Sequence, residues 1–261
     1  MSVPPHQAAV DFTDRIVLLT GGAGDLGRAI VAELRERGAR VAVNDIIPED
    51  EAVQRIAFDD RVTYLRGDAA EPGVAAALLD GCERAFDGLP DTLCCHAGVV
   101  RSAPILEIEP TDVARVLHDN VVPGFALAQE QARRWIAQRQ AGLILFTSSW
   151  VQDVPWPGIA AYSASKAAVR AIARSFAREL APHGIRANVI APGIVGAGMA
   201  KRQWDTEPEY QQRAKRAIPL GALQSPESVA NTVVLAMSPL AEYMTGATLL
   251  VDGGASLYPM D

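Results

Sequence analysis

Tyr162 and Lys166 lie four residues apart, at the start of a run rich in helix-forming residues from Ala164 to Leu180. At this spacing two side chains share one face of a helix, one turn apart. A free phenol has a pKa of about 10, and a neighbouring ammonium group favours the phenolate and lowers that pKa. A phenol tuned in this way can take a proton from an alcohol or give one to a carbonyl. The same pair also fits an ordinary exposed helical turn, so the surrounding sequence must decide between the two interpretations.

A glycine-rich turn provides the second chemical pattern. The apolar run Ile16 to Thr20 leads into Gly21-Gly-Ala-Gly-Asp-Leu-Gly27, and apolar residues at helical spacing continue up to Gly38. A second short apolar run covers residues 41–43. The order strand, glycine turn, helix, strand is the unit that holds the pyrophosphate of a dinucleotide at a helix N-terminus. Glycines are required there because the backbone must approach the phosphates closely.

The elements that must position these residues alternate along the chain. Further strands are expected at residues 62–65, 92–95, 143–147, 185–190 and 248–251, and helices at 72–86 and 111–138, the latter interrupted by Pro123-Gly124. Strands that alternate with helices predict a parallel sheet covered on both faces. We therefore expect an α/β fold of the Rossmann type, doubly wound, with a seven-stranded parallel sheet in one domain over residues 15–261. Residues 1–14 are expected to form a flexible N-terminal arm.

Ligands of such sheets bind beyond the carboxyl ends of the strands. Several polar or turn-forming residues lie at or just after predicted strand ends: Gly21, Asp45, Asp68, His96, Ser149 and Pro192.

The composition excludes several other classes of protein. The chain of 261 residues is 49% hydrophobic with a formal net charge of -7, and no basic tract indicates nucleic-acid binding. No apolar run is long enough to span a membrane, and residues 1–14 do not have the pattern of a secretory signal. Three cysteines and four widely separated histidines suggest neither a disulfide framework nor a metal site. A reducing cytoplasm fits this composition best.

Taken together, these motifs resemble the short-chain dehydrogenase/reductase family, from about Arg15 to Ala255. The matching residues are Thr20-Gly21 and Gly27 in the cofactor turn, Asp68, Ala97-Gly98, the set Asn120, Ser149, Tyr162 and Lys166, then Pro192-Gly193, Thr245-Gly246 and Val251-Asp252-Gly253-Gly254. Ser149 precedes Tyr162 by 13 residues, which is the spacing of the family.

The resemblance implies a role for each catalytic residue. Tyr162 would be the acid/base, Lys166 would lower its pKa and bind the nicotinamide ribose, Ser149 would hold the substrate oxygen, and Asn120 would take part in a proton relay through water. The implied cofactor contacts are Gly21, Gly24, Asp25, Leu26, Gly27, Asp45, Asp68, Ala69, Ala97, Gly98, Tyr162, Lys166, Pro192, Gly193 and Val195. The resemblance further implies a homotetramer, or a homodimer, in which the long helices starting at Thr111 and Ala164 pack between subunits.

Three departures from the family pattern bear on the site. Asp25 replaces the usual middle glycine of the turn, and its charge would be unfavourable beside a pyrophosphate unless the side chain points away. Cys95-His96 replaces an Asn-Asn pair, and His96 is interpreted either as a structural residue or as a substrate contact. Ala197 replaces the threonine that usually binds the nicotinamide carboxamide, which leaves the backbone near Val195 for this role.

The expected cofactor is NAD(H), because Asp45 ends the second strand about 20 residues past the glycine turn. A carboxylate there can accept hydrogen bonds from the ribose hydroxyls, and it would repel the phosphate that NADP carries at that position. Asn44 is the other candidate ribose contact.

The expected substrate is a small polar secondary alcohol or ketone such as a sugar, polyol or hydroxy acid. Residues 196–219 are expected to form a substrate lid, whose five basic and three acidic residues give a formal charge of +2. Expected substrate contacts are Ser149, His96, Trp150, Gln152, Trp156, Met199 and Trp204. The alternatives are a hydrophobic or 3-oxoacyl ketone, a lyase or epimerase that uses bound NAD, and a non-catalytic NAD-binding protein on the same fold. A Ser-His hydrolase is disfavoured because no Gly-x-Ser-x-Gly turn is present.

Overall fold

The computed structural model describes residues 10–257. Its centre is one seven-stranded sheet in the order β3-β2-β1-β4-β5-β6-β7, in which every neighbouring pair is parallel. The strands are β1 (Ile16–Thr20), β2 (Arg40–Asp45), β3 (Val62–Arg66), β4 (Thr92–Cys95), β5 (Gly142–Thr147), β6 (Ile185–Pro192) and β7 (Thr248–Val251). The predicted fold class, a doubly wound parallel sheet of the Rossmann type in a single domain, is confirmed.

Strand β1 lies inside the sheet, between β2 and β4, and this position explains why its residues 16–19 are all apolar. Leu18 pairs with Ala42 of β2 on one side and with Leu93 of β4 on the other, and its side chain is fully buried. Neighbouring Val17 and Leu19 point to the opposite face and are equally buried, in a second core cluster. Both faces of a parallel sheet are covered by helices, so residues 16–19 are apolar, and the polar Thr20 stands at the carboxyl end of the strand.

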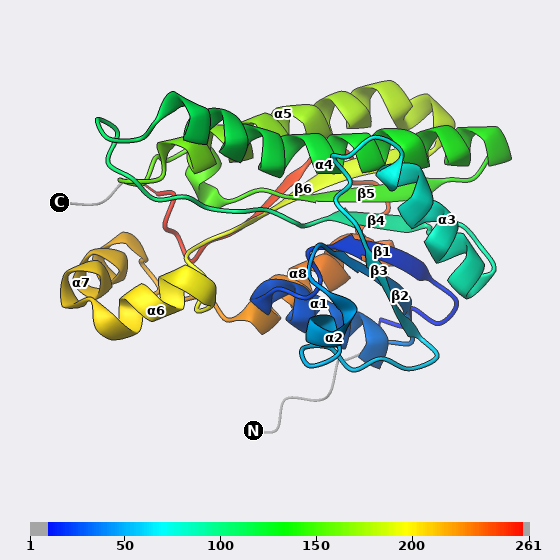
Figure 1. Cartoon of the computed structure of the whole chain (residues 1–261), viewed down its shortest axis with the longest axis horizontal. Coiled ribbons are helices and arrows are strands. Elements are labelled where there is room, and N and C mark those ends of the chain that lie inside the picture. The colour runs from blue at the N-terminus through cyan, green and yellow to red at the C-terminus, as the bar shows by residue number, and fades with distance from the viewer. Residues whose placement is uncertain (1–9, 258–261) are drawn as a thin grey trace.

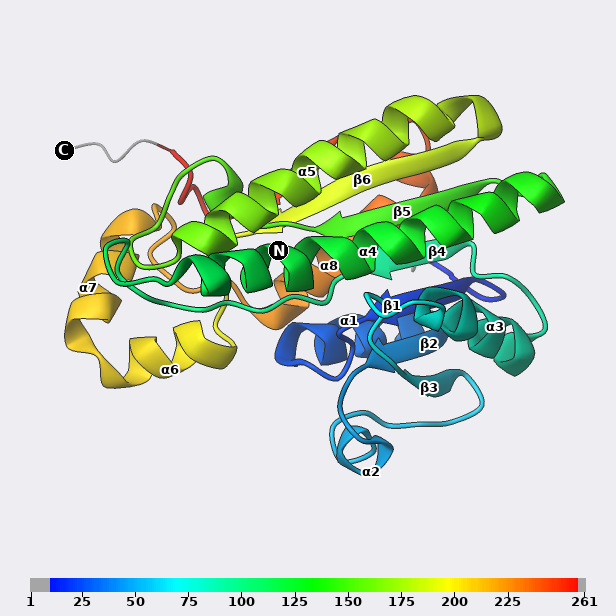
Figure 2. The same cartoon turned by 45° about the horizontal axis from the view of Figure 1, so that its top comes forward.

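Helices cover the two faces in separate groups. They are α1 (Asp25–Glu36), α2 (Glu49–Ala52), α3 (Val74–Phe86), α4 (Pro110–Gln138), α5 (Ala160–Leu180), α6 (Gly198–Thr206), α7 (Pro208–Ala217) and α8 (Pro226–Met237). Helices α3, α4 and α5 pack on one face of the sheet, and α1 and α8 on the other (Figures 1 and 2). Helices α6 and α7 extend beyond the sheet next to the carboxyl ends of its strands (Figure 1).

The structure differs from the sequence expectations at three places. Helix α4 continues through Pro123, although proline lacks the N–H that would bond the carbonyl four residues earlier. Helix α8 was not predicted, although Ser225 caps its N-terminus by accepting a bond from the Ser228 N–H at 3.1 Å. The expected arm over residues 1–14 lies partly outside the described residues, but Phe12 is only 1% exposed and its N–H bonds the Arg37 carbonyl. The packed domain therefore begins before Arg15, because Phe12 belongs to its core.

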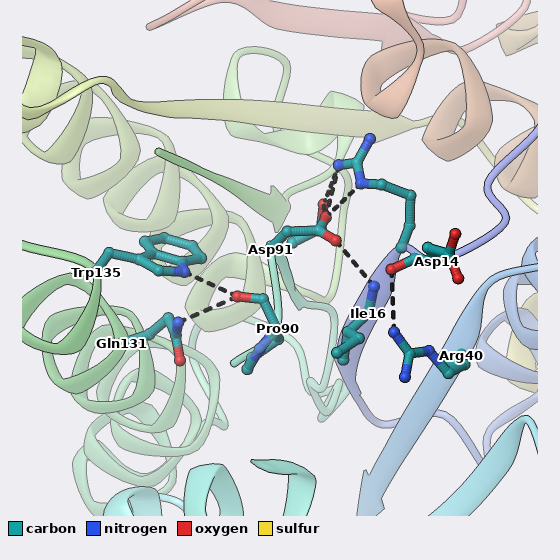
Figure 3. Close-up of polar contacts among 9 residues, drawn as sticks. Asp14, Ile16, Arg40, Pro90, Asp91, Gln131 and Trp135 are labelled. Atoms are coloured by element: carbon teal, nitrogen blue, oxygen red, sulfur yellow. Dashed lines mark hydrogen bonds and ion pairs between the residues drawn. The ribbon is translucent and has the colours of Figure 1, made fainter. Parts of the chain in front are cut away.

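Polar side chains hold the amino end of the sheet together (Figure 3). One Asp91 oxygen accepts bonds from Arg15 Nε at 2.7 Å and from the Thr92 hydroxyl at 2.9 Å, and the other accepts from the Ile16 N–H at 2.9 Å. The Pro90 carbonyl accepts from Trp135 Nε1 at 2.8 Å. These bonds tie the starts of β1 and β4 to each other and to α4, on the edge opposite the predicted site.

Residues 10–257 meet the requirements neither of a membrane-spanning helix nor of a metal site. No helix in this range is both long and apolar enough to cross a membrane. In the same range, no three His, Cys, Asp or Glu side chains gather closely enough to hold a metal ion.

Candidate active site

A cavity of about 730 Å³ opens at the carboxyl ends of the strands, between the glycine turn and helices α6 and α7. Most of the predicted cofactor contacts line it, and these are Gly21, Gly24, Asp25, Leu26, Asp45, Asp68, Ala69, Ala97, Gly98, Pro192, Gly193 and Val195. The cavity also reaches Ser149, Tyr162 and Lys166. One continuous space therefore joins the predicted dinucleotide-binding turn to the predicted catalytic side chains.

Helix α5 positions Tyr162 and Lys166 in its first two turns, so that both side chains face the cavity. The Lys166 Nζ lies 5.4 Å from the centroid of the Tyr162 ring. The ammonium group donates a hydrogen bond to the Thr147 carbonyl at 2.9 Å, and Lys166 as a whole is 3% exposed. The Ser148 hydroxyl donates to the Lys166 carbonyl at 2.8 Å. The end of β5 thus fixes both the side chain and the backbone of this lysine.

Burial dominates the protonation of this pair. It raises the pKa of Tyr162 to about 12, although a hydrogen bond with the Ser149 hydroxyl opposes the change. Burial also lowers the pKa of Lys166 to about 8, because the ammonium loses its hydration. The expected lowering of the phenol pKa by Lys166 is therefore outweighed, and the phenol is protonated at neutral pH.

Ser149 brings a second hydroxyl to the same wall of the cavity. It follows β5, is 7% exposed, and accepts a long hydrogen bond of 3.5 Å from the Val151 N–H. Its hydroxyl also lies near the Tyr162 phenol and opposes the rise in the pKa of that phenol. Two adjacent hydroxyls can hold one carbonyl or alcohol oxygen between them, which is the geometry that proton transfer requires.

Asn120 lies behind this wall rather than on it. Its side-chain oxygen accepts from the Val99 N–H at 2.7 Å, and its amide group donates to the Val99 carbonyl and to the Ser165 hydroxyl, each at 2.9 Å. A Cβ built on Gly98 would lie 3.1 Å from the Lys166 Nζ and 3.2 Å from the Asn120 Oδ1. Asn120 therefore holds the loop after β4 and brings its oxygen close to Lys166, in a space that only glycine leaves open.

The glycine turn fits a dinucleotide cofactor by its close backbone contacts. Gly21 has φ +68, and a Cβ there would lie 2.8 Å from the Ala97 Cα. A Cβ on Gly27 would lie 2.3 Å from the Gly21 carbonyl oxygen, so this residue closes the turn from behind, although it does not line the cavity. The backbone of the turn is thus free of side chains where phosphates would approach the start of α1.

Asp25 points away from this turn. One carboxylate oxygen pairs with Arg28 at 2.7 Å, and the other accepts a hydrogen bond of 2.9 Å from the Gly198 N–H at the start of α6. The unusual acid in the turn is therefore already neutralised, and it connects the turn to a helix 173 residues further along the chain.

Asp45 lines the far end of the cavity and also supports the turn. Its Oδ2 accepts from the Ala23 N–H at 3.1 Å and its Oδ1 from the Ile46 N–H at 2.8 Å. Each carboxylate oxygen retains capacity for a further hydrogen bond. Asn44 also lines the cavity, but it is 4% exposed and its amide group already donates to the Leu65 and Gly67 carbonyls.

The catalytic end is lined by aromatic and apolar side chains, and two of the expected substrate contacts lie outside this lining. Trp150, Trp156, Met199 and His96 line the cavity, whereas Gln152 and Trp204 do not. Gln152 is 8% exposed and its amide group donates to Asp153 at 3.2 Å. Trp204 belongs to the core beneath the lid, and the Lys215 Nζ lies 5.4 Å from the centroid of its ring.

His96 combines a cavity position with a structural hydrogen bond. Its Nδ1 lies 3.0 Å from the Thr147 hydroxyl, and its backbone N–H donates to the Thr20 hydroxyl at 3.0 Å. Burial first, and then the charge of Lys166, lower its pKa to about 4, so the ring is neutral at neutral pH. His96 thereby joins the ends of three neighbouring strands.

Sequence reasoning missed two arginines that line the cavity, Arg55 after helix α2 and Arg213 at the lid. Arg55 follows the short helix α2, which was not predicted, and pairs with Glu51. Arg213 belongs to the expected lid, but nothing in its local sequence separates it from the four other basic residues there.

Comparison with known proteins agrees with this geometry. A family model described as "Enoyl-(Acyl carrier protein) reductase" matches residues 21–256, which is nearly the whole chain. The chain belongs to the short-chain dehydrogenase/reductase family. It is an oxidoreductase that acts on CH–OH donors and uses a nicotinamide cofactor.

Three curated relatives cover almost the full chain but differ in substrate. The chain is 33% identical to a cis-4-hydroxycyclohexanecarboxylate dehydrogenase of Sinomonas cyclohexanicum, with 93% of this chain and 97% of the relative aligned. It is 31% identical to a glucose 1-dehydrogenase of Gluconobacter oxydans (95% and 94% aligned). It is 30% identical to a 3beta-hydroxysteroid dehydrogenase of Eggerthella lenta (95% and 96% aligned).

Two solved structures are similar over 95% of this chain and 98% or more of their own. A gluconate 5-dehydrogenase from Burkholderia cenocepacia, in complex with NADP and tartrate, has a TM-score of 0.86 at 28% identity. A 2-deoxy-D-gluconate 3-dehydrogenase from Agrobacterium tumefaciens, assigned by similarity and with NADP bound, has a TM-score of 0.84 at 28% identity.

Proposed function

We propose that this enzyme transfers a hydride between NAD(H) and a secondary alcohol or ketone on a small polar molecule. The observation that carries the proposal is that Ser149, Tyr162 and Lys166 line one cavity, which continues to the glycine turn. Of these residues, Lys166 provides a buried positive charge.

The residues divide the work of the reaction between them. The nicotinamide ring of the bound cofactor would accept or supply the hydride. Ser149 and Tyr162 hold the substrate oxygen, and Tyr162 takes the alcohol proton during oxidation or gives one to the carbonyl during reduction. Lys166 stabilises the phenolate that oxidation requires, since an ammonium near the ring favours its charged form.

Asn120 supports this proton transfer from behind. Its side-chain oxygen already accepts one hydrogen bond from Val99, and an amide oxygen has a second lone pair. Together with the space at Gly98, this would allow a water molecule to bond both Asn120 and Lys166. We assign to Asn120 the role of carrying the proton away from the site through such a water.

Tyr162→Phe tests the catalytic assignment. The variant should lose about 10²-fold or more in turnover, because it lacks the hydroxyl that transfers the proton, while cofactor binding persists. The measurement combines NADH formation with a fluorescence titration of NADH binding. A variant that retains more than about a tenth of the turnover would remove Tyr162 from its role. A loss of both turnover and NADH binding would indicate damage to the fold.

We further propose that the cofactor is NAD(H) rather than NADP(H), although the two solved neighbours bind NADP. Asp45 supports this choice, because a carboxylate repels the additional ribose phosphate and can accept hydrogen bonds from a free hydroxyl. Arg55 at the same end of the cavity is paired with Glu51, so its charge is partly neutralised.

The cofactor preference is measured as kcat/KM for NAD and for NADP at saturating substrate. We expect NAD to be preferred by about 5- to 150-fold, as repulsion at close range would give. Asp45→Ala should narrow the gap, mainly by weakening the use of NAD. Equal values in the unmodified enzyme, or a preference for NADP, would contradict the assignment.

The quaternary structure and location are part of the same proposal. We infer a homotetramer or homodimer in the cytoplasm, with α4 and α5 packing between subunits. The partly exposed side chains of Val122, Phe125 and Ile136 on α4 support this role. Light scattering on the purified enzyme measures the mass, and a monomer at micromolar concentration would contradict the inference.

A further inference from the structure

We propose that Arg213 binds a carboxylate of the substrate, so that the preferred substrate is a hydroxy acid, or the corresponding oxo acid, rather than a neutral sugar or polyol. The inference rests on the proposed function and narrows its substrate class. It starts from the position of Arg213 on α7, where it lines the same cavity as Ser149 and Tyr162.

Two aromatic rings hold the guanidinium in place. Its carbon Cζ lies 4.8 Å from the centroid of the Trp156 ring and 5.7 Å from that of the Tyr210 ring. The two rings meet edge to face, with centroids 6.4 Å apart, and Trp156 also packs against Trp150. Stacking fixes the plane of a guanidinium while its N–H groups remain free to donate. Arg213 is thus oriented by the wall that follows Ser149.

The charge of Arg213 is not neutralised within the described part of the chain. No carboxylate of residues 10–257 lies within 4.0 Å of its guanidinium nitrogens, whereas Lys201 on the same lid pairs with Asp205. The other basic residues of the lid do not line this cavity. The lid therefore presents one unpaired positive charge to the catalytic space.

None of the acids that line the cavity pairs with Arg213. Asp25 pairs with Arg28, Asp45 and Asp68 lie at the expected cofactor contacts, and Asp119 lies 3.3 Å from His118. The catalytic end thus holds two hydroxyls for an alcohol oxygen and a guanidinium for an anion. A guanidinium binds a carboxylate through two parallel N–H bonds.

The experiment compares hydroxy acids with their own primary amides, so that charge is the main difference within each pair. Suitable probes are cis-4-hydroxycyclohexanecarboxylate and gluconate, each with its amide and with NAD. We expect kcat/KM to be about 10- to 100-fold higher for the acid, as a hydrogen bond to a charged group would give. Arg213→Met should reduce the acid to the level of the amide and leave the amide within about threefold.

Arg216→Met is the matched control, because Arg216 lies on the same helix and does not line the cavity. This variant should keep the preference for the acid. Equal kcat/KM values for acid and amide in the unmodified enzyme, or an equal loss for both in Arg213→Met, would overturn the inference while leaving the proposed function intact.

A binding measurement separates this inference from the chemistry. Cyclohexanecarboxylate has no hydroxyl, so it tests the anion site alone, and Trp156 beneath Arg213 provides a fluorescence signal. With NADH present, we expect its dissociation constant to rise about tenfold or more in Arg213→Met and to stay unchanged in Arg216→Met. Binding that is the same in both variants would overturn the inference. Absence of turnover with every alcohol, with this binding retained, would instead contradict the proposed function.

Discussion

At the amino end of the sheet, Asp91 bonds Arg15, Thr92 and the Ile16 backbone with its two oxygens, and the Pro90 carbonyl bonds Trp135 (Figure 3). The carboxyl end also carries polar groups, but they are arranged differently. There the Tyr162 and Ser149 hydroxyls face a cavity, and burial holds the pKa of Tyr162 and of Lys166 away from their ordinary values. Polar groups that satisfy one another hold a fold together, whereas groups kept free at some cost in stability are available to a ligand.

Lys166→Met should show the largest difference between an effect on turnover and an effect on stability. Turnover should fall by about 10²-fold or more, because the charge that favours the phenolate is lost. The free energy of unfolding should not fall, since folding already disfavours the buried ammonium, as its lowered pKa indicates. Turnover and urea denaturation of the same preparation measure both. Lys201→Met on the exposed face of α6 is the control, and a stability loss above about 2 kcal/mol in Lys166→Met would make this lysine structural.

Asp91→Asn should show the opposite behaviour at the other end of the sheet. The substitution keeps the shape but removes the charge that strengthens the hydrogen bonds of Asp91 with Arg15, Thr92 and the Ile16 N–H. Hydrogen bonds to a charged group contribute about 1.5–3 kcal/mol, and partial exposure of Arg15 and Asp91 reduces this, so we expect a loss of about 1–3 kcal/mol. Since the site is at the far edge, kcat/KM should stay within about twofold. In Asp80→Asn the exposed Asp80 loses its charge while Arg134 keeps its pair with Glu130, so the variant should cost less than about 1 kcal/mol. A large fall in kcat/KM with unchanged stability in Asp91→Asn would contradict the view that the amino end of the sheet serves stability and the carboxyl end serves catalysis.

His96→Asn tests whether a residue at the carboxyl end can also contribute to stability. His96 lies at that end, but its hydrogen bonds to Thr147 and Thr20 are those of a structural residue. An unfolded histidine binds a proton below about pH 6.5, whereas burial holds the pKa of folded His96 to about 4. Its contribution to stability is present above pH 6.5 and is lost as the pH falls toward 4. Between pH 7 and 5 this loss should be about 1–2 kcal/mol in the unmodified protein and absent from His96→Asn. Denaturation curves at both pH values measure it, with the exposed His118→Asn as control; parallel losses in all three proteins would refute the role of burial.

The sequence predicted those features that depend on local patterns. Apolar runs between turns located β1, β4 and β7 to the residue, and the spacing of glycines, Tyr162 and Lys166 identified the family. The orientation of lid side chains has no such local pattern, since it depends on how α6 and α7 pack against the loop after β5. That is why Trp204 was expected in the cavity and is in the lid core, while Arg213 was not singled out.

Hydrogen bonds to backbone groups far away in the sequence explain the unexpected roles of Asn44 and Asp25. Asn44 looked like a ribose contact, but the Leu65 and Gly67 carbonyls of a neighbouring segment use its amide group, and such long-range partners cannot be read from one strand. The role of Asp25 was hidden for the same reason, because its partner Gly198 is far away in the chain.

The hydrogen bond between Asp25 and Gly198 means that the glycine turn and the lid of this enzyme cannot be replaced independently of each other. Protein engineers often graft a lid from one relative onto the cofactor domain of another, or restore a consensus residue in a turn. In this chain, a consensus glycine at position 25 would remove an anchor of α6, and a foreign lid would leave the carboxylate of Asp25 without its partner. The two segments form one unit of design and should be exchanged together.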